Sequence, residues 1–562
     1  METEESKSTP EVVFDLNAAT APVLCNVIQI PHGLKAAMRT PEWPKWHEAM
    51  KTQFGTLRQK GAYKMVLRKQ MINGARVLPN SWVYTIKTND DGTTTFKARL
   101  VIGGHLQKKG IDYGETFASV VKFASVRLVL AIATRRGWRV HKVDFVAAFL
   151  NSLLQEKVYM RQIPGFEDGT ERVLELIKAL FGLKQSPREW QKKLREILGS
   201  MGFKPLQTDS SLYTDGNLII PVYVDDLLVT GPDESAIIAM IKRFQEGYDI
   251  KNFGRMQSIL GMEWERNMNT QTSYLTQKRY TQAVLEKFGM SDCRPQSTPA
   301  IVQKEDDFTG LLKETGPYLE AVGSLIYLST CTRPDIALAV STVARKMQAP
   351  TERDWMAVKR IFRFLKGTED HGIRFDAKGE EKLTLYADAD FGGPEEQRRS
   401  RSGYVVFYGN SPISWFTKLQ PGLPATSTVE AEFRSAATGT QELLWLQHLM
   451  GELGSKLKLE LVTSQPLLKE DNQGAIAAMR NDVQHSRLKH VELKYFFIKQ
   501  VVEEGEMEVD YCPTSEQIAD LLTKPLGRQK FEYFSRRIGA VSSRPQGRIP
   551  AMSSTSQEGE LK

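Results

Sequence analysis

Cysteine is scarce in this sequence of 562 residues, and the few cysteines are not spaced for metal binding. Cys25, Cys293, Cys331 and Cys512 lie far apart, and no two of them form a C-x2-C pair. This spacing argues against a zinc knuckle or a zinc ribbon, which needs paired ligands. Because no disulfide framework is evident either, we expect a protein of a reducing compartment.

Long apolar runs, a leader sequence and internal repeats are also missing. No apolar stretch approaches the roughly 18 residues of a membrane span. The acidic and polar start, METEESKSTPEVV, is the opposite of a signal peptide. We therefore expect an intracellular protein that does not use a membrane as a partner.

What is present is an ordinary globular composition with a slight basic excess. Hydrophobic residues make up 41% and charged residues 25%, and the length favours several domains. Lysine and arginine number 75 against 67 aspartates and glutamates, which gives a net charge of +8. That excess permits a polyanionic partner without requiring one.

The chain divides into segments of different texture. Residues 1–40 lack periodicity and predict a weakly ordered lead-in. The next segment, 41–250, alternates helices with strands, and NDDGT predicts a hairpin turn at Gly92. Residues 251–380 mix helices and turns with a linker, and 381–530 follow a β-β-β-α-β-α-β-α order typical of a compact α/β domain. The Ser-, Arg- and Gly-rich tail, 531–562, predicts disorder.

An aspartate pair interrupts the apolar stretch PVYVDDLLVT, residues 221–230. The flanks predict two strands that meet at a tight turn near Asp225 and Asp226. A solvated turn is the simple alternative, since aspartate is common in turns. Buried flanks favour a site instead, because carboxylates at the tip of buried strands need a compensating charge. Mg2+, which prefers oxygen ligands, supplies one.

A further carboxylate, Asp144, lies on an earlier predicted strand in KVDFVAAFL. Alternation along this strand places Lys142 and Asp144 on one face. Bringing Asp144 beside Asp225 would hold two metal ions close together, the arrangement of two-metal phosphoryl transfer. The alternative is a strand-end residue paired with Lys142 or Arg139.

A second set of carboxylates lies after residue 381, and in the expected element order its members converge. They would repel one another unless metal ions filled the gap, and two Mg2+ ions could direct a water at a phosphodiester. Each of them alone is more often a solvated surface charge. The set comprises Asp388 in LYADADF, Glu432 in STVEAEF, Asp471 in KEDNQGAI and Asp520 in QIADLLTKPL. Near neighbours that could be mistaken for members are Asp390 and Glu430, and His490 is a candidate assisting residue.

These blocks resemble a known family. YVDD, KVDFVAAFL, FKARLVIGGHLQKKGIDYGETFASVVKFASVRLVLAIA and FGLKQSPREW are similar to the reverse transcriptase of Ty1/copia-type LTR retrotransposons. RSGYVVFYGN, DNQGAI, LKHVELKYFFIKQ and ADLLTKP resemble the ribonuclease H of the same elements. The resemblance covers about residues 40–530. It implies an α+β right-hand polymerase with fingers and palm in 41–250 and thumb and connection in 251–380, followed by an α/β ribonuclease H-like domain in 381–530.

The resemblance also implies roles for individual residues. Asp144 and Asp225 correspond to direct ligands of Mg2+ or Mn2+, and Asp226 to a secondary one. All four acidic residues of the later set correspond to ribonuclease H metal ligands. Phe149 corresponds to an aromatic under the incoming sugar, which would clash with a 2′-hydroxyl, although core packing is the alternative.

Basic and polar residues upstream complete the implied substrate site. Lys97 and Arg99 fall where the fingers grip a triphosphate, and fixed cations suit the charge that develops there. Gln185, with Lys184, corresponds to the lining of the nucleotide pocket. For both pairs a solvated surface position is the alternative.

The implied function is RNA-directed DNA synthesis on RNA and DNA templates, with hydrolysis of the RNA strand of RNA–DNA hybrids. Its partners would be an RNA template, a DNA primer, the hybrid and dNTPs, together with the integrase and capsid parts of the same element. We expect a cytoplasmic particle or the nucleus as its location. Because no nucleocapsid knuckle, protease or integrase motif is present, we expect the carboxy-terminal portion of a longer polyprotein.

Two rival interpretations remain open at this point. Several positions depart from the family pattern: Ala118, Ser119, Ser152, Leu153, Phe391 and Phe496. Such departures are typical of a drifting copy, so one rival is a catalytically inactive, nucleic-acid-binding remnant of a copia-type element. The other is a two-metal nucleotidyl transferase without ribonuclease H activity, against which the second carboxylate set argues.

Overall fold

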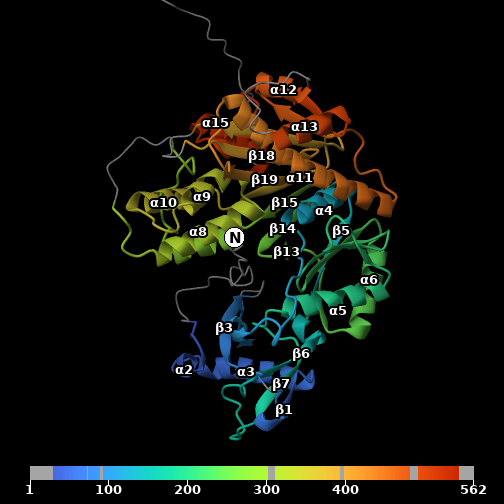
Figure 1. Ribbon diagram of the computed structural model, residues 1–562, viewed down its shortest axis with the longest axis vertical. Coiled ribbons are helices and arrows are strands. Elements are labelled where there is room, and N and C mark those ends of the chain that lie inside the picture. The colour runs from blue at the N-terminus through green and yellow to red at the C-terminus, as the bar shows by residue number, and fades with distance from the viewer. Residues whose placement is uncertain are drawn as a thin grey trace, which may run out of the picture.

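The computed structural model describes residues 30–72, 74–88, 93–301, 310–392, 398–480 and 492–543. Within these ranges helices and strands are mixed, and the strands form sheets of four, six, five, five and two strands. Figure 1 shows the amino-terminal lobe at one end of the molecule and the carboxy-terminal elements at the other.

The amino-terminal lobe, blue to teal in Figure 1, is a four-stranded sheet with a separate hairpin and the helix α3. Its core is aromatic: Trp46 of α3 packs edge-on against Tyr84 and Phe96 of the hairpin. The sheet order is β1-β7-β6-β2 and the hairpin is β3-β4. The elements are α2 Leu34–Ala37, α3 Trp43–Gln59, β1 Tyr63–Val66, η1 Arg68–Gln70, β2 Val77–Leu78, β3 Asn80–Thr88, β4 Thr94–Ile102, η2 Gly104–Leu106, β6 Leu153–Met160 and β7 Val173–Lys178.

Part of the expected lead-in is ordered, and the expected hairpin forms. Residues 1–29 lie outside the described part, but the expectation of weak order up to residue 40 is wrong, because α2 forms and buries Ala37. The hairpin strands pair in register from Thr88↔Thr94 to Asn80↔Ile102. The predicted turn residue, Gly92, lies outside the described residues.

A six-stranded antiparallel sheet, order β12-β5-β11-β10-β9-β8, forms the middle of the molecule. Alternation along β11 sends Leu227 and Val229 to the side of α5 and α6, and Leu228 to the side of α4. The elements are α4 Phe123–Arg136, β5 Arg139–Phe145, η3 Ala148–Asn151, α5 Ser186–Ser200, β8 Lys204–Pro205, β9 Leu212–Thr214, β10 Ile219–Tyr223, β11 Asp226–Gly231, α6 Glu234–Gly247 and β12 Ile250–Arg255. Since β12 pairs with β5, this unit extends past the boundary expected at residue 250.

The segment expected to mix helices and turns also contributes strands. A five-stranded sheet has the order β13-β14-β15-β16-β22, so the final strand comes from the far end of the chain. The elements are β13 Ser258–Ile259, β14 Met262–Asn267, β15 Thr272–Thr276, α7 Lys278–Lys287, α8 Gly316–Cys331, η4 Pro334–Ile336, α9 Ala337–Ala344, α10 Glu352–Lys366, β16 His371–Asp376 and β22 Ala540–Ser542.

The expectation of a disordered tail from residue 531 is therefore wrong for residues 531–543. Helix α15, Arg528–Arg537, buries Phe531 and Phe534, and β22 pairs with β16 through Ile373↔Ala540. The apolar side chains of this segment outweigh its Ser, Arg and Gly content once β16 offers a free edge. Residues 544–562 lie outside the described part.

The carboxy-terminal sheet has the order β19-β18-β17-β20-β21, with β20 and β21 parallel to the central β17. Its strands follow the expected order along the chain, but two helices, α12 and α13, lie between the fourth and fifth strands, where the expected order has one. The elements are β17 Leu383–Asp390, β18 Arg401–Tyr408, β19 Ser411–Leu419, α11 Thr428–Leu457, β20 Leu467–Glu470, α12 Gln473–Arg480, α13 Glu492–Glu503, β21 Glu508–Tyr511 and α14 Asp520–Thr523.

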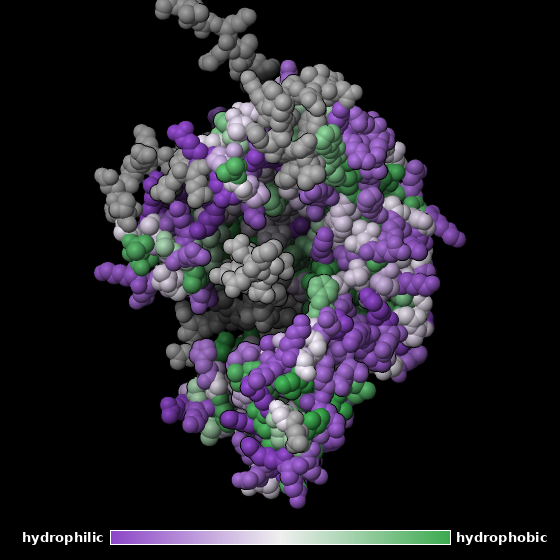
Figure 2. All heavy atoms as spheres, in the orientation of Figure 1, coloured by the Kyte–Doolittle hydropathy of each residue, from purple (hydrophilic) through white to green (hydrophobic). Residues whose placement is uncertain are grey.

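The middle and carboxy-terminal units share one hydrophobic core. Helix α4 packs against β19 and β16, and its buried side chains belong to the same cluster as Leu385 of β17 and Phe433 of α11. Figure 2 shows a largely hydrophilic face with scattered hydrophobic side chains. No helix in the described ranges is long and apolar enough to cross a membrane.

Candidate active sites

The aspartate pair lies on a strained turn between β10 and β11. Val224, which precedes Asp225, has a φ of 57°, in the left-handed region that a β-branched residue rarely adopts. Two hydrogen bonds hold the turn: Trp190 donates to the carbonyl of Val224 at 2.6 Å, and the amide of Phe145 donates to that of Asp225 at 3.3 Å. Strain of this kind persists only where the surroundings over-determine the backbone, which here fixes Asp225.

Strand pairing brings the three predicted polymerase carboxylates together. Asp226 is the direct partner of Asp144 in the β11–β5 register, so both lie on one face of the sheet. Asp225 adjoins them at the end of β10. The negative charge of Asp226 is balanced by Lys142, whose Nζ lies 2.8 Å from Asp226 Oδ1. The lysine expected as an alternative partner of Asp144 therefore pairs with Asp226.

Burial and mutual repulsion make two of these groups reluctant to ionise. Burial, with the charges of Asp144 and Asp226, raises the pKa of Asp225 to about 7. Burial and the charge of Asp226 also raise the pKa of Asp144, against opposing contributions from Lys142 and Lys251. A divalent cation would relieve this repulsion, so the donor set fits one.

The two basic residues predicted on β4 approach these aspartates. The positive charge of Lys97 acts on Asp144 and that of Arg99 on Asp225. Arg99 also contacts Thr85 at 3.4 Å and lies over the ring of Phe181 at 5.7 Å. The hairpin thus carries its cations toward the carboxylates instead of into bulk solvent.

Phe149 is half-buried on the short helix η3 and packs edge-on against Phe181, with ring centroids 4.9 Å apart. Arg99 of β4 lies over the ring of Phe181, so Phe181 contacts both η3 and the β3-β4 hairpin. Phe181 was not singled out from the sequence, where it is one aromatic in FGLKQSPREW.

Gln185 does not lie on an exposed lining. It is fully buried, with its amide donating to the carbonyl of Asp112 at 2.9 Å and its oxygen accepting from Gln107 at 3.0 Å. This side chain holds the segment around Gln107 in place. Lys184 is closer to the surface and lies over the ring of Tyr113 at 4.8 Å.

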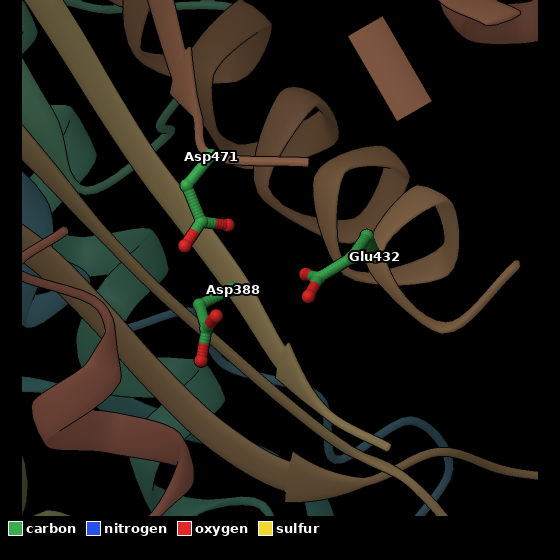
Figure 3. Close-up of side chains that lie close together, drawn as sticks. All are labelled: Asp388, Glu432 and Asp471. Atoms are coloured by element: carbon green, nitrogen blue, oxygen red, sulfur yellow. The ribbon is translucent and has the colours of Figure 1, made fainter. Parts of the chain in front are cut away.

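The second site is more compact. One carboxylate oxygen from each of Asp388, Glu432 and Asp471 lies within 4.8 Å of the other two. Figure 3 shows the three side chains converging, with Glu432 coming from α11 and Asp471 from the end of β20. Among the residues that the structure describes, no other group of three or more acidic, His or Cys residues gathers this closely.

Close packing of α14 on β18 completes this site. A Cβ on Gly403, the cross-strand partner of Asp388, would lie 2.6 Å from Thr523 Cγ2. Only glycine allows this approach, which places the Thr523 hydroxyl where it donates to Asp388 Oδ2.

Burial raises the pKa values of two of these carboxyl groups. Burial, modified by Lys524 and Asp520, raises the pKa of Asp388 to about 7. Burial and the neighbouring Glu470 raise the pKa of Glu432 well above its ordinary value. Glu432 Oε2 is buried and has no hydrogen-bond partner among the described residues, and such an orphaned oxygen fits a hard cation such as Mg2+ or Mn2+.

Asp520 stands apart from the other three. It is fully buried at the start of α14, where Lys524 Nζ lies 2.7 Å from its Oδ1 and Lys530 contacts its Oδ2. The predicted set of four is thus a group of three carboxylates and a fourth that is neutralised by lysines.

The neighbours that could be confused with this set have other roles or places. Glu430 accepts hydrogen bonds from the backbone and hydroxyl of Thr426, both at 2.7 Å, and pairs with Arg434, so it belongs to the start of α11. Asp390 is half-buried at the end of β17. His490 lies outside the described residues.

The contacts of three charged residues beside the carboxylates, Lys524, Lys142 and Glu470, were not predicted from the sequence. Lys524 follows Asp520 by four residues, a spacing that places two side chains of a helix together and could have indicated the pair. Lys142, two residues before Asp144, was considered only as a partner of that residue. Glu470, buried beside Glu432, is adjacent in sequence to Asp471 and gave no separate signal.

Comparison with known proteins identifies the family. The model of the family described as "Reverse transcriptase (RNA-dependent DNA polymerase)" matches residues 62–302. The chain is 38% identical over 520 residues to the Retrovirus-related Pol polyprotein from transposon RE2 of Arabidopsis thaliana, covering 91% of this chain and 35% of that protein. It is 36% identical over 550 residues to the Pol polyprotein from transposon TNT 1-94 of Nicotiana tabacum, covering 95% and 41%.

A more distant relative is the Transposon Ty1-ER2 Gag-Pol polyprotein of Saccharomyces cerevisiae, 22% identical over 495 residues, covering 84% of this chain and 27% of that protein. The chain therefore spans between about a quarter and two-fifths of the length of these three curated relatives. The matched segment contains Asp144, Asp225 and Asp226, and the similarity to the Pol polyproteins extends over nearly the whole chain. The chain belongs to the reverse transcriptase family and is a copia-type retrotransposon Pol region.

Proposed function

We propose that this chain is an RNA-directed DNA polymerase that extends a DNA primer on RNA and DNA templates. The observation that carries the proposal is the convergence of Asp144, near the end of β5, with Asp226 of β11 and with Asp225 in the turn before β11, in a chain of this family. Two half-buried carboxylates that repel each other are poised to take up divalent cations.

Each surrounding side chain has a task in this proposal. Asp144 and Asp225 hold Mg2+ or Mn2+, while Asp226 forms an ion pair with Lys142 and is a secondary ligand. Bound ions would activate the primer 3′-hydroxyl and neutralise charge on the departing pyrophosphate. Lys97 and Arg99 receive the triphosphate, and Phe149 excludes a 2′-hydroxyl.

The architecture that we propose is a right hand followed by a ribonuclease H-like domain. The amino-terminal lobe would be the fingers, the six-stranded sheet with α4, α5 and α6 the palm, and residues from β13 to β16 the thumb and connection. The domain from β17 to α14 would be the ribonuclease H-like part. Its sheet order, with three antiparallel strands and two parallel additions, supports this assignment.

The polymerase proposal is tested by primer extension on an RNA template with dNTPs and Mg2+. Asp225→Asn should abolish extension, because it removes a ligand charge while keeping the shape of the side chain. Asp292→Asn, the same substitution at an exposed position, is the matched control and should extend normally. Absence of extension by a folded wild-type chain that still binds an RNA–DNA hybrid would favour the inactive remnant.

A second activity, hydrolysis of the RNA strand in an RNA–DNA hybrid, is favoured by the carboxylates of Asp388, Glu432 and Asp471. These would hold the ions that direct water at the phosphodiester. End-labelled RNA in a hybrid should be cleaved by the wild type and by Asp225→Asn, but not by Asp471→Asn. Loss of cleavage in all three would argue against a separate hydrolytic site.

The partners follow from the same chemistry. A template–primer duplex would be held mainly through phosphate contacts, so binding should weaken as salt rises, in keeping with the net charge of +8. The integrase and capsid parts of the same element are proposed as further partners, in a cytoplasmic particle or the nucleus.

A further inference from the structure

Lys524 lies between two carboxylates of the second site. Its Nζ is 2.7 Å from Asp520 Oδ1 and 3.8 Å from Asp388 Oδ2. Asp520 and Asp388 are buried, whereas the Lys524 side chain is about a third exposed, at 35%. A single ammonium group therefore bridges Asp520 to the group of three.

Among the residues that the structure describes, Glu432 and Asp471 form no ion pair with a lysine, whereas Asp388 lies 3.8 Å from Lys524. Asp388, Glu432 and Asp471 offer oxygens within 4.8 Å of one another, and Glu432 Oε2 has no hydrogen-bond partner within the described part of the chain. The site therefore has two parts. The space among Asp388, Glu432 and Asp471 holds no ammonium group of the described residues. The space between Asp388 and Asp520 already contains the ammonium group of Lys524.

We propose that Lys524 is a positioning residue that takes the place of a cation between Asp388 and Asp520 in the free protein. The free protein would then bind one divalent ion, at Asp388, Glu432 and Asp471, and admit a second only after the ammonium group moves away. This inference rests on the proposed hydrolytic function and adds an order of events to it.

Electrostatics and reach support this role. An ammonium group and a divalent ion in the same gap of a few ångströms would repel each other by several kcal/mol at the effective dielectric of a partly buried site, about 20. Lys524 can leave without unfolding α14, because its side chain reaches solvent and Lys530 remains on Asp520. An entering phosphodiester would offer the departing ammonium group a new anionic partner.

The test counts Mn2+ ions bound to the full chain, with Asp144→Asn and Asp225→Asn present so that the first site is silent. Electron paramagnetic resonance of free Mn2+ gives the number bound without any activity measurement. We expect one tightly bound ion in this background and also with Lys524→Arg, which keeps the charge. With Lys524→Met a second ion should bind, with affinity raised about tenfold or more, because a like charge has left the gap.

Two controls keep the outcomes distinct. Lys242→Met, at an exposed position of α6, should leave one ion bound, and Lys524→Gln provides a second neutral variant if Lys524→Met fails to fold. Equal binding of two ions with and without the lysine, or one ion in both, would overturn the inference while leaving the site intact. If no variant binds Mn2+ and Asp388→Asn changes nothing, the proposed hydrolytic function fails as well.

Discussion

The guanidinium group of Arg127 donates to the backbone carbonyl of Ile413 at 2.6 Å, across 286 residues of sequence. The same side chain donates to the carbonyls of Thr330 and Cys331 at 2.8 and 3.1 Å and lies over the ring of Trp415 at 4.0 Å. One buried arginine on α4 thus joins the six-stranded sheet unit, the end of α8 and the carboxy-terminal strand β19. Burial lowers its pKa to about 10, so it remains charged at neutral pH.

Arg127→Met should destabilise the chain by about 3 kcal/mol, because three carbonyls, two of them on buried residues, lose a charged donor. Thermal or urea unfolding would measure the change. Arg243→Met, the same substitution at an exposed position of α6, should cost less than about 0.5 kcal/mol. Equal, small effects of both substitutions would mean that Arg127 does not join the units energetically.

Phe149→Val should relax discrimination against ribonucleotides about 10- to 200-fold, the range that a change of pocket size allows. The reason is that the ring that packs against Phe181 no longer fills the space expected beneath the sugar. Primer extension with rCTP against dCTP gives the ratio of kcat/KM values. Phe496→Val, at an exposed aromatic on α13, is the control, and an unchanged ratio in Phe149→Val would assign this ring to core packing.

The metal-free chain should lose stability as the pH rises. Burial and neighbouring carboxylates raise the pKa of Asp225 to about 7, and burial raises that of Asp388 to about 7. Between the ordinary value of 3.8 and about 7, the folded chain holds protons that the unfolded chain has released, so the free energy of unfolding falls across this window.

Melting temperatures in EDTA should therefore be higher at pH 5 than at pH 8, and Mg2+ should restore stability mainly at pH 8, where its ligands ionise. A chain with Asp225→Asn and Asp388→Asn should show a flatter pH profile in EDTA and little response to Mg2+. The same slope in the variant and the wild type would assign the pH dependence to other groups.

Glu470→Gln and Glu430→Gln should have opposite effects, although both residues are buried. Burial raises the pKa of Glu470 well above its ordinary value and thereby favours the protonated carboxyl, so its amide isostere should keep or increase stability. Burial also disfavours ionised Glu430, but hydrogen bonds from Thr426 and the charge of Arg434 outweigh it and lower the pKa.

Replacing the ionised Glu430 should therefore cost about 1–3 kcal/mol, since hydrogen bonds to a charged group are lost. Urea unfolding midpoints at pH 7 would compare the two variants with the wild type. A larger loss of stability in Glu470→Gln than in Glu430→Gln would show that Glu470 is ionised in the folded chain.

Local patterns in the sequence determined a large part of this protein. Continuous apolar runs on either side of Asp225 and Asp226 specify β10 and β11, and the sequence pattern after residue 381 indicates most of the strands and helices of that domain. Asp225 and Asp226 stand out because they are carboxylates in an apolar run, whereas Asp144, Asp388, Glu432 and Asp471 were singled out by the expected element order and by motifs that resemble those of copia-type elements.

Only the tertiary structure decided which charges meet. Lys142 pairs with Asp226 and Lys524 with Asp520, and Gln185 turns inward to Gln107 and Asp112. Likewise, β22 joins a sheet whose other strands begin more than 150 residues earlier, which overturned the expected tail. Such outcomes depend on sheet register and on the packing of distant segments, whose energies are spread over many contacts and leave no local pattern in the sequence.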